Sequence, residues 1–126
     1  MNQVNGYSKV AHNLINQLAK NDWIRLTHFA TQCLKNADIQ RKYPENVRVI
    51  DGSALDKSKE GTGFGFAELC NVIRNETPDI VFIYNDIIVI NGYIEELHKA
   101  FTGRSFKLWA YIDTMYNAIP QSLIDT

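Results

Sequence analysis

The stretch Asp79-Ile80-Val81-Phe82-Ile83-Tyr84 decides the fold class. Its nearly continuous apolar run follows Pro78 and is typical of a strand buried on both faces of a parallel sheet. After Asn85-Asp86, apolar residues recur every three or four positions from Ile87 to Phe101. The period therefore changes from strand to helix at Asp86, which is a favourable N-cap residue.

The same alternation of strand and helix extends in both directions. Helical spacing predicts a helix over 6–20 and another that starts near Phe66 and ends before Pro78. A further helix is expected near Pro120, and Gly103 fits the position after a helix C-terminus. Runs of β-forming residues predict the remaining strands, over 23–29, 47–50 (before an Asp51-Gly52 turn) and 106–112. The segment 31–46 is polar and predicted to be irregular.

This order of elements predicts one α/β domain over residues 1–126. Short connections between helices and strands favour a Rossmann-like, mostly parallel sheet with helices on both faces. The sequence opens with a helix, whereas such folds open with a strand that leads into that helix. The first strand of the sheet is therefore predicted to be missing, and a partner chain could fill its place.

Composition excludes several classes of partner. Thirteen basic and fourteen acidic residues give a net charge of −1, without the clustered charge of a nucleic-acid or membrane-surface protein. Cys33 and Cys70 lie far apart, and neither has a second ligand at metal-binding spacing, so we expect reduced thiols and no metal. The N-terminus lacks signal-peptide features and no apolar run is long enough to span a membrane, which favours a cytoplasmic protein.

Polar loops at the carboxyl ends of the strands are the candidate site, because ligands of open parallel sheets bind at that edge. Gly6, before the first helix, could approach an anion, although ordinary turn chemistry also explains it. The glycines at 61, 63 and 65 could cradle a phosphate but lack a preceding strand, which favours a flexible loop. Asp86 could bind a ligand or only cap its helix, and Asp113 could contact sugar hydroxyls or be a solvated turn acid.

Histidines and aromatic residues carry no recognisable catalytic constellation. His12 is predicted on the polar face of the first helix, His28 in a strand and His98 near a helix end. The aromatic residues of the predicted strands are interpreted as core or half-core side chains, namely Trp23, Tyr84, Trp109 and Tyr111. We assign no histidine to catalysis.

Two motifs carry a resemblance to a known family: Gly6-Tyr7-Ser8-Lys9-Val10-Ala11-His12-Asn13-Leu14 and Pro78-Asp79-Ile80-Val81-Phe82-Ile83-Tyr84-Asn85-Asp86. They resemble the N-terminal domain of group-one, retaining glycosyltransferases of the GT-B fold, especially those encoded by large DNA viruses. Tyr111-Ile112-Asp113 is similar to the strand of that family that ends in an acid at the cleft. The similarity covers most of the chain in the same order.

The resemblance implies the acceptor-side lobe of a two-domain enzyme that transfers a sugar from a nucleotide-sugar donor. Gly6 and Tyr7 would approach the donor phosphates, and Asn85, Asp86 and Asp113 would line the acceptor side. No other cofactor is implied. The donor-binding lobe would follow Thr126 or come from a second chain, so we expect no transfer by this chain alone.

The resemblance also implies partners and a location. The acceptor would be a carbohydrate or a glycosylated molecule, and a viral protein would act in the host cytoplasm. The alternative is a non-catalytic remnant, or a carbohydrate- or nucleotide-binding module of the same fold. A receiver or flavodoxin-like module fits less well, because the chain lacks an acidic pair after a first strand and a hydroxyl-rich phosphate loop.

Overall fold

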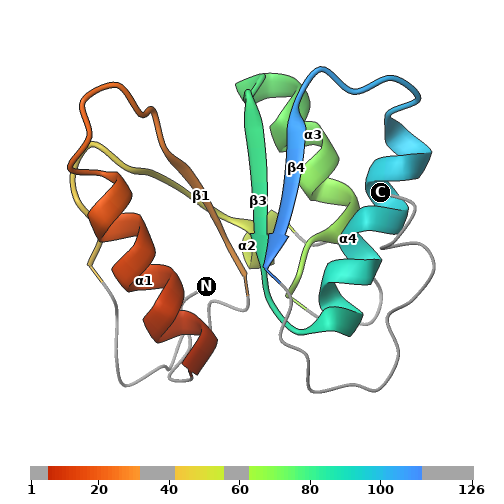
Figure 1. The fold of residues 1–126 in the computed structure, drawn as a ribbon. Coiled ribbons are helices and arrows are strands. Elements are labelled where there is room, and N and C mark those ends of the chain that lie inside the picture. Colours follow the sequence, from red (N-terminus) through yellow and green to blue (C-terminus); the bar gives the residue numbers. More distant parts are fainter. Residues whose placement is uncertain (1–5, 32–41, 56–62, 112–126) are drawn as a thin grey trace. The chain divides into compact units, whose positions relative to one another are not determined.

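The structure is a computed structural model that describes residues 6–31, 42–55 and 63–111. It divides into two compact units, one up to Gly65 and one from Phe66 onward (Figure 1). The elements in chain order are α1 (Gly6–Leu18), β1 (Thr27–Ala30), β2 (Arg48–Asp51), α2 (Gly52–Leu55), α3 (Phe66–Glu76), β3 (Ile80–Tyr84), α4 (Ile87–Ala100) and β4 (Lys107–Tyr111).

The first unit packs α1 against a pair of short parallel strands. β1 pairs with β2 from Thr27↔Arg48 to Ala30↔Asp51. Ile15 of α1 and Ala19, which follows the helix, form a small buried cluster with Val47. A backbone hydrogen bond from Arg48 N to Leu26 O, 3.1 Å long, extends the ladder by one residue.

The second unit contains the larger described core. β3 and β4 are parallel, in register from Ile80↔Lys107 to Tyr84↔Tyr111. The helices α3 and α4 pack against each other, and the close approach of Phe66 to α4 depends on Gly92, where a Cβ would lie 2.8 Å from the Phe66 ring. The buried apolar residues of this unit are Leu69, Cys70, Ile73, Val81, Ile83, Ile87, Ile90, Tyr93, Ile94, Leu97 and Phe106.

Both strand pairs confirm the predicted α/β class with parallel pairing. The described strands form two separate two-stranded sheets, β1–β2 and β3–β4, and a single continuous Rossmann-like sheet is not part of the described structure. Residues 1–5 and the predicted helix near Pro120 lie outside the described residues. The predicted first-strand gap and the single domain over 1–126 therefore stay predictions.

The prediction that β3 is buried on both faces is wrong. Val81 and Ile83 are buried, while Ile80 and Phe82 expose 44% and 46% of their surface. The cause is the position of the helices, because α3 and α4 both lie on the same side of β3 and β4 (Figure 1). Side chains alternate along a strand, so only every second residue of β3 meets these helices.

Two local predictions also need correction. Trp23 is 83% exposed and is not a core residue. It lies in a turn closed by a 3.1 Å hydrogen bond from Ile24 N to Asn21 O, and β1 starts only at Thr27. At the end of α4, Phe101 in an extended conformation is the C-cap, so Gly103 is not the residue that terminates the helix.

Candidate functional site

Asn85 and Asp86 follow β3 directly, at the carboxyl end of the strand as predicted. Asn85 is buried, and its Oδ1 accepts a 2.8 Å hydrogen bond from the backbone N–H of Asp86. Asp86 is the N-cap of α4, and its Oδ1 accepts a 2.9 Å hydrogen bond from Ile88 N. The capping interpretation of Asp86 is therefore confirmed, and Asn85 holds the turn that presents it.

Aromatic side chains flank this turn on the neighbouring strand ends. Tyr84 and Tyr111 are register partners, and their rings meet edge to face with 5.0 Å between centroids. Tyr111 exposes 58% of its surface, and Ile88 in the first turn of α4 exposes 69%. This end of the second unit thus combines a carboxylate with exposed ring surface, groups that can together bind a ligand with both polar and apolar parts.

The other predicted site residues lie in the first unit or outside the described residues. Gly6 is the first residue of α1 in the first unit, and the side chain of Tyr7 lies outside the described residues. Asp113 lies outside them as well. Convergence of Gly6, Asp86 and Asp113 on one cleft stays a prediction.

A second carboxylate, Asp51, stands at the carboxyl end of β2. Its Oδ1 accepts hydrogen bonds from Ser53 N at 3.0 Å, Ser53 Oγ at 2.6 Å and Ala54 N at 3.1 Å. The carboxylate thereby caps the short helix α2, as Asp86 caps α4. The Asp-Gly signal at 51 and 52 was interpreted only as a turn, and its helix-capping role is visible only in the structure.

The glycine-rich loop before α3 has a structural explanation at Gly65. Gly63 and Gly65 have positive φ angles of 75° and 60°, a backbone conformation that side chains disfavour. A Cβ at Gly65 would lie 2.8 Å from the carbonyl oxygen of Gly52, and one at Gly52 would lie 2.5 Å from the Phe29 ring. Close packing therefore requires glycine at Gly65 without any phosphate, while Gly61 lies outside the described residues.

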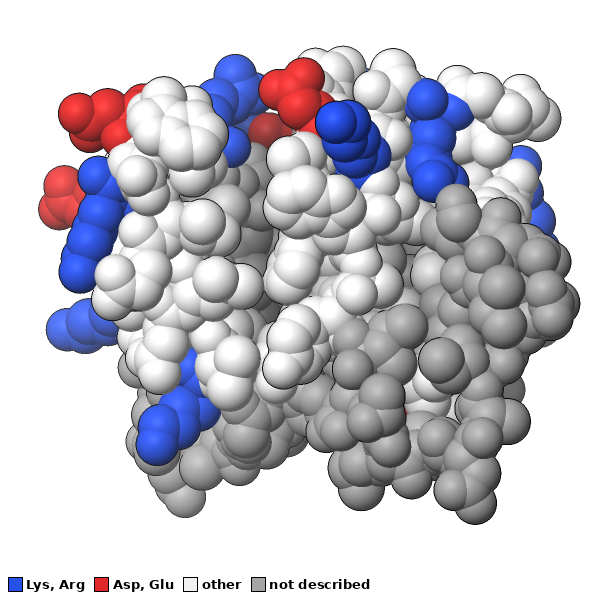
Figure 2. All heavy atoms as spheres, viewed as in Figure 1, with Lys and Arg blue, Asp and Glu red and all other residues white. Residues whose placement is uncertain are grey.

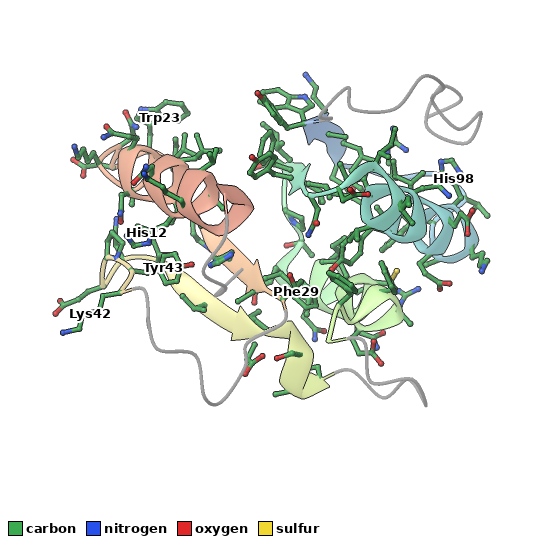
Figure 3. All side chains as sticks on the ribbon, turned by 90° about the horizontal axis from the view of Figure 1, so that it is seen from below. His12, Trp23, Phe29, Lys42, Tyr43 and His98 are labelled. Atoms are coloured by element: carbon green, nitrogen blue, oxygen red, sulfur yellow. The ribbon has the colours of Figure 1, made fainter. Side chains whose placement is uncertain are left out.

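Two histidines of the first unit contact the ring of Tyr43, and this contact was not predicted from the sequence. The rings of His12 and His28 lie 5.2 Å and 4.8 Å from the Tyr43 ring, and Figure 3 shows His12 and Tyr43 turned toward each other. His12 Nε2 also contacts Asn16 Nδ2 at 3.0 Å, one helical turn along α1. His12 was expected on the polar face of the helix, and in the structure this position is partly buried because Tyr43 packs on it.

Burial lowers the pKa of His28 from 6.5 to about 3. The imidazole is therefore neutral near pH 7, and it is too weak a base for general acid–base catalysis at that pH. His98 lies in the last turn of α4, as predicted, and is exposed.

The described cysteine, Cys70, is a buried free thiol. Its Sγ contacts the backbone carbonyl oxygen of Glu96 at 3.7 Å, and burial raises its pKa. The thiol form is inert as a nucleophile. Cys33 lies outside the described residues, and the described part of the chain contains no group of three or more potential metal ligands.

A shallow pocket of about 100 Å³ lies at the opposite, amino ends of β3 and β4. Its apolar floor includes Ile73, Phe101 and Phe106, with Thr77 and Arg104 also in the lining. The Phe101 and Phe106 rings are 5.4 Å apart, and the Arg74 guanidinium lies 5.1 Å from the Phe101 centroid. This pocket does not coincide with the predicted ligand edge.

Among the described residues, no helix is long and apolar enough to cross a membrane. Searches for related proteins found that no family model and no curated protein matches this chain.

Proposed function

We propose that this chain is the acceptor-binding lobe of a GT-B-type glycosyltransferase. In this role it holds a carbohydrate acceptor, and a second lobe or chain binds the nucleotide-sugar donor. Gly6 and Tyr7 face the donor phosphates in the assembled enzyme, and Asn85, Asp86 and Asp113 line the acceptor side. In this proposal the α/β fold is the N-terminal, Rossmann-like half of a GT-B enzyme, and the enzyme acts in the cytoplasm.

The observation that supports this proposal most is the group at the carboxyl ends of β3 and β4. Asp86 supplies a carboxylate on a turn held by the buried Asn85, and the exposed Tyr111 lies on the neighbouring strand end. Sugars present hydroxyls around their edge and apolar C–H groups on their faces. A carboxylate next to an exposed ring is complementary to both.

The same group explains why the chain alone is expected not to transfer a sugar. Glycosyl transfer develops negative charge on the departing nucleotide phosphate, and catalysis requires donors positioned around it. Asp86 is an anion already committed to capping α4, and the neutral His28 is buried in the first unit. Binding of the acceptor and activation of the donor are therefore separate tasks.

Acceptor binding can be tested without a donor. The purified chain is titrated with neutral oligosaccharides by calorimetry, and the Asp86→Asn variant is compared with Asp79→Asn. Asparagine caps a helix as well as aspartate does, so Asp86→Asn removes the charge but keeps the cap. Asp79 precedes β3 at its other end and is the matched control. We expect weaker binding only for Asp86→Asn, and equal affinities of both variants would refute the site.

The alternative function is a non-catalytic carbohydrate- or nucleotide-binding module. The observation that favours this module is that Asp51 and Asp86 both accept hydrogen bonds as helix caps. A carboxylate held in this way is occupied by a structural role. Incubation with nucleotide sugars, an oligosaccharide and the product of an adjoining reading frame separates the two functions. Transfer with that second protein supports the enzyme lobe, and binding without transfer supports the module. Transfer by this chain alone would refute the expectation that a second lobe or chain must bind the donor.

A further inference from the structure

The exposed side of β3 and β4 carries a compact group of aromatic side chains. Because the two strands are parallel and in register, Phe82 lies beside Trp109, and Tyr84 lies beside Tyr111, on the same side. Phe82, Trp109 and Tyr111 expose 46%, 54% and 58% of their surface. We call these four residues the aromatic face.

The size of the aromatic face excludes most macromolecular partners. Five residues per strand, at about 3.3 Å per residue, and two strands about 4.8 Å apart give an area on the order of 200 Å² with side chains. A stable protein interface needs about 800 Å² from each partner, which a second copy of the chain could not obtain here. A patch of this size fits an elongated small ligand.

The charge around the aromatic face indicates a neutral ligand. Lys107 is the charged residue on this side of the two strands, at their amino ends, and Asp86 follows β3 at the other end. Figure 2 shows charged side chains gathered toward the upper rim over β3 and β4, with uncharged surface below them. Single-stranded nucleic acid also stacks on aromatic rings, but it requires a positively charged groove along its backbone.

We infer that the aromatic face is a stacking platform for a neutral oligosaccharide, with successive sugar rings lying on Tyr111 and Trp109. The end of the glycan reaches the carboxylate of Asp86, which follows β3 at the carboxyl end of the aromatic face. This inference rests on the proposed function and defines its acceptor as an oligosaccharide of at least two sugars. The flat C–H faces of sugar rings pack on aromatic rings, while hydroxyls at the edge remain available for hydrogen bonds.

Two tryptophans allow a direct test by fluorescence. Trp109 lies on the aromatic face, whereas Trp23 is 83% exposed in a turn of the first unit and is a built-in control. The probes are maltohexaose and N-acetylchitohexaose, which are both neutral. We expect at least one probe to shift the emission of Trp23→Phe, whose remaining tryptophan is Trp109, and to leave the emission of Trp109→Phe unchanged.

Affinity measurements test the contribution of each ring. Trp109→Ala and Tyr111→Ala are each expected to weaken hexasaccharide binding by about tenfold, the loss of one stacked ring. Trp109→Phe keeps an aromatic ring, so its affinity for the hexasaccharide is expected to fall less than that of Trp109→Ala. The affinity of Trp23→Ala is expected to remain unchanged. Circular dichroism identifies any variant that does not fold. Both alanine variants change exposed side chains, so at least one is expected to remain folded.

The outcomes separate this inference from the proposed function. If Asp86→Asn weakens binding but Trp109→Ala and Tyr111→Ala do not, the acceptor site stands and the stacking platform is wrong. If neither probe binds, both are wrong. A thymidine dodecanucleotide is titrated in parallel, and its binding in place of the hexasaccharides would assign the aromatic face to nucleic acid and overturn the inference.

Discussion

Acidification is expected to destabilise the chain through His28. The pKa of this histidine is about 3 in the folded protein and 6.5 when unfolded, because burial disfavours the charged imidazolium. The unfolded state therefore binds more protons between these values, and the stabilisation present above pH 6.5 is lost as the pH falls toward 3. With these two pKa values, the free energy of unfolding decreases by about 2 kcal/mol between pH 8 and pH 5.

The assay is urea denaturation followed by circular dichroism at pH 8, 6.5 and 5. His28→Gln removes the titrating group, and His98→Gln removes an exposed histidine of α4 as the matched control. We expect the loss of about 2 kcal/mol to persist in the control and to shrink below about 0.5 kcal/mol in His28→Gln. Any packing cost of the glutamine cancels, because each variant is compared with itself at different pH.

If His28→Gln shows the same pH dependence as the unmodified chain, His28 is not the group that destabilises the protein in acid. An NMR titration gives an independent check on the cause. The ring resonances of His28 should not titrate between pH 8 and pH 5 in the folded protein. A midpoint for His28 near 6.5 would mean that the imidazole is not desolvated.

Three further predictions concern local structure. Gly65→Ala should lower the free energy of unfolding by roughly 2 kcal/mol or more, because alanine is disfavoured at φ 60° and its Cβ would press on a backbone oxygen. Gly103→Ala, with nothing within 4 Å of its Cβ, should change stability little; equal effects in urea denaturation would contradict the packing argument. Asp86→Ala should cost about 1 kcal/mol through loss of the α4 cap, whereas Asp86→Asn should cost little in the same assay. In a Cys33→Ser variant, Cys70 should react with a thiol reagent at pH 7.5 only after denaturant is added, because it is buried and its pKa is raised, and rapid labelling of the folded variant would contradict this.

The candidate site was only partly accessible to sequence reasoning. Asn85 and Asp86 could be placed at a strand end because the change from a strand period to a helical period occurs at that point. Tyr111 could not be placed beside them, since the register of β3 and β4 joins residues 27 positions apart. The contact of His12 and His28 with Tyr43 was hidden for the same reason, although the helical pair His12 and Asn16 has a spacing visible in the sequence.

The sequence by itself determined the longer helices and the existence of the described strands, because hydrophobic period and capping residues act over a few neighbours, whereas the short helix α2 and the start of β1 were not predicted. The helix that starts at Phe66 and the Asp86 cap of α4 were both predictable in this way. Tertiary structure decided which faces of those elements are covered. The apolar sequence of β3 predicts a strand with two buried faces, yet α3 and α4 lie on one side of it and leave Phe82 exposed. An apolar side chain makes burial favourable, but whether it is buried depends on where distant segments of the chain pack.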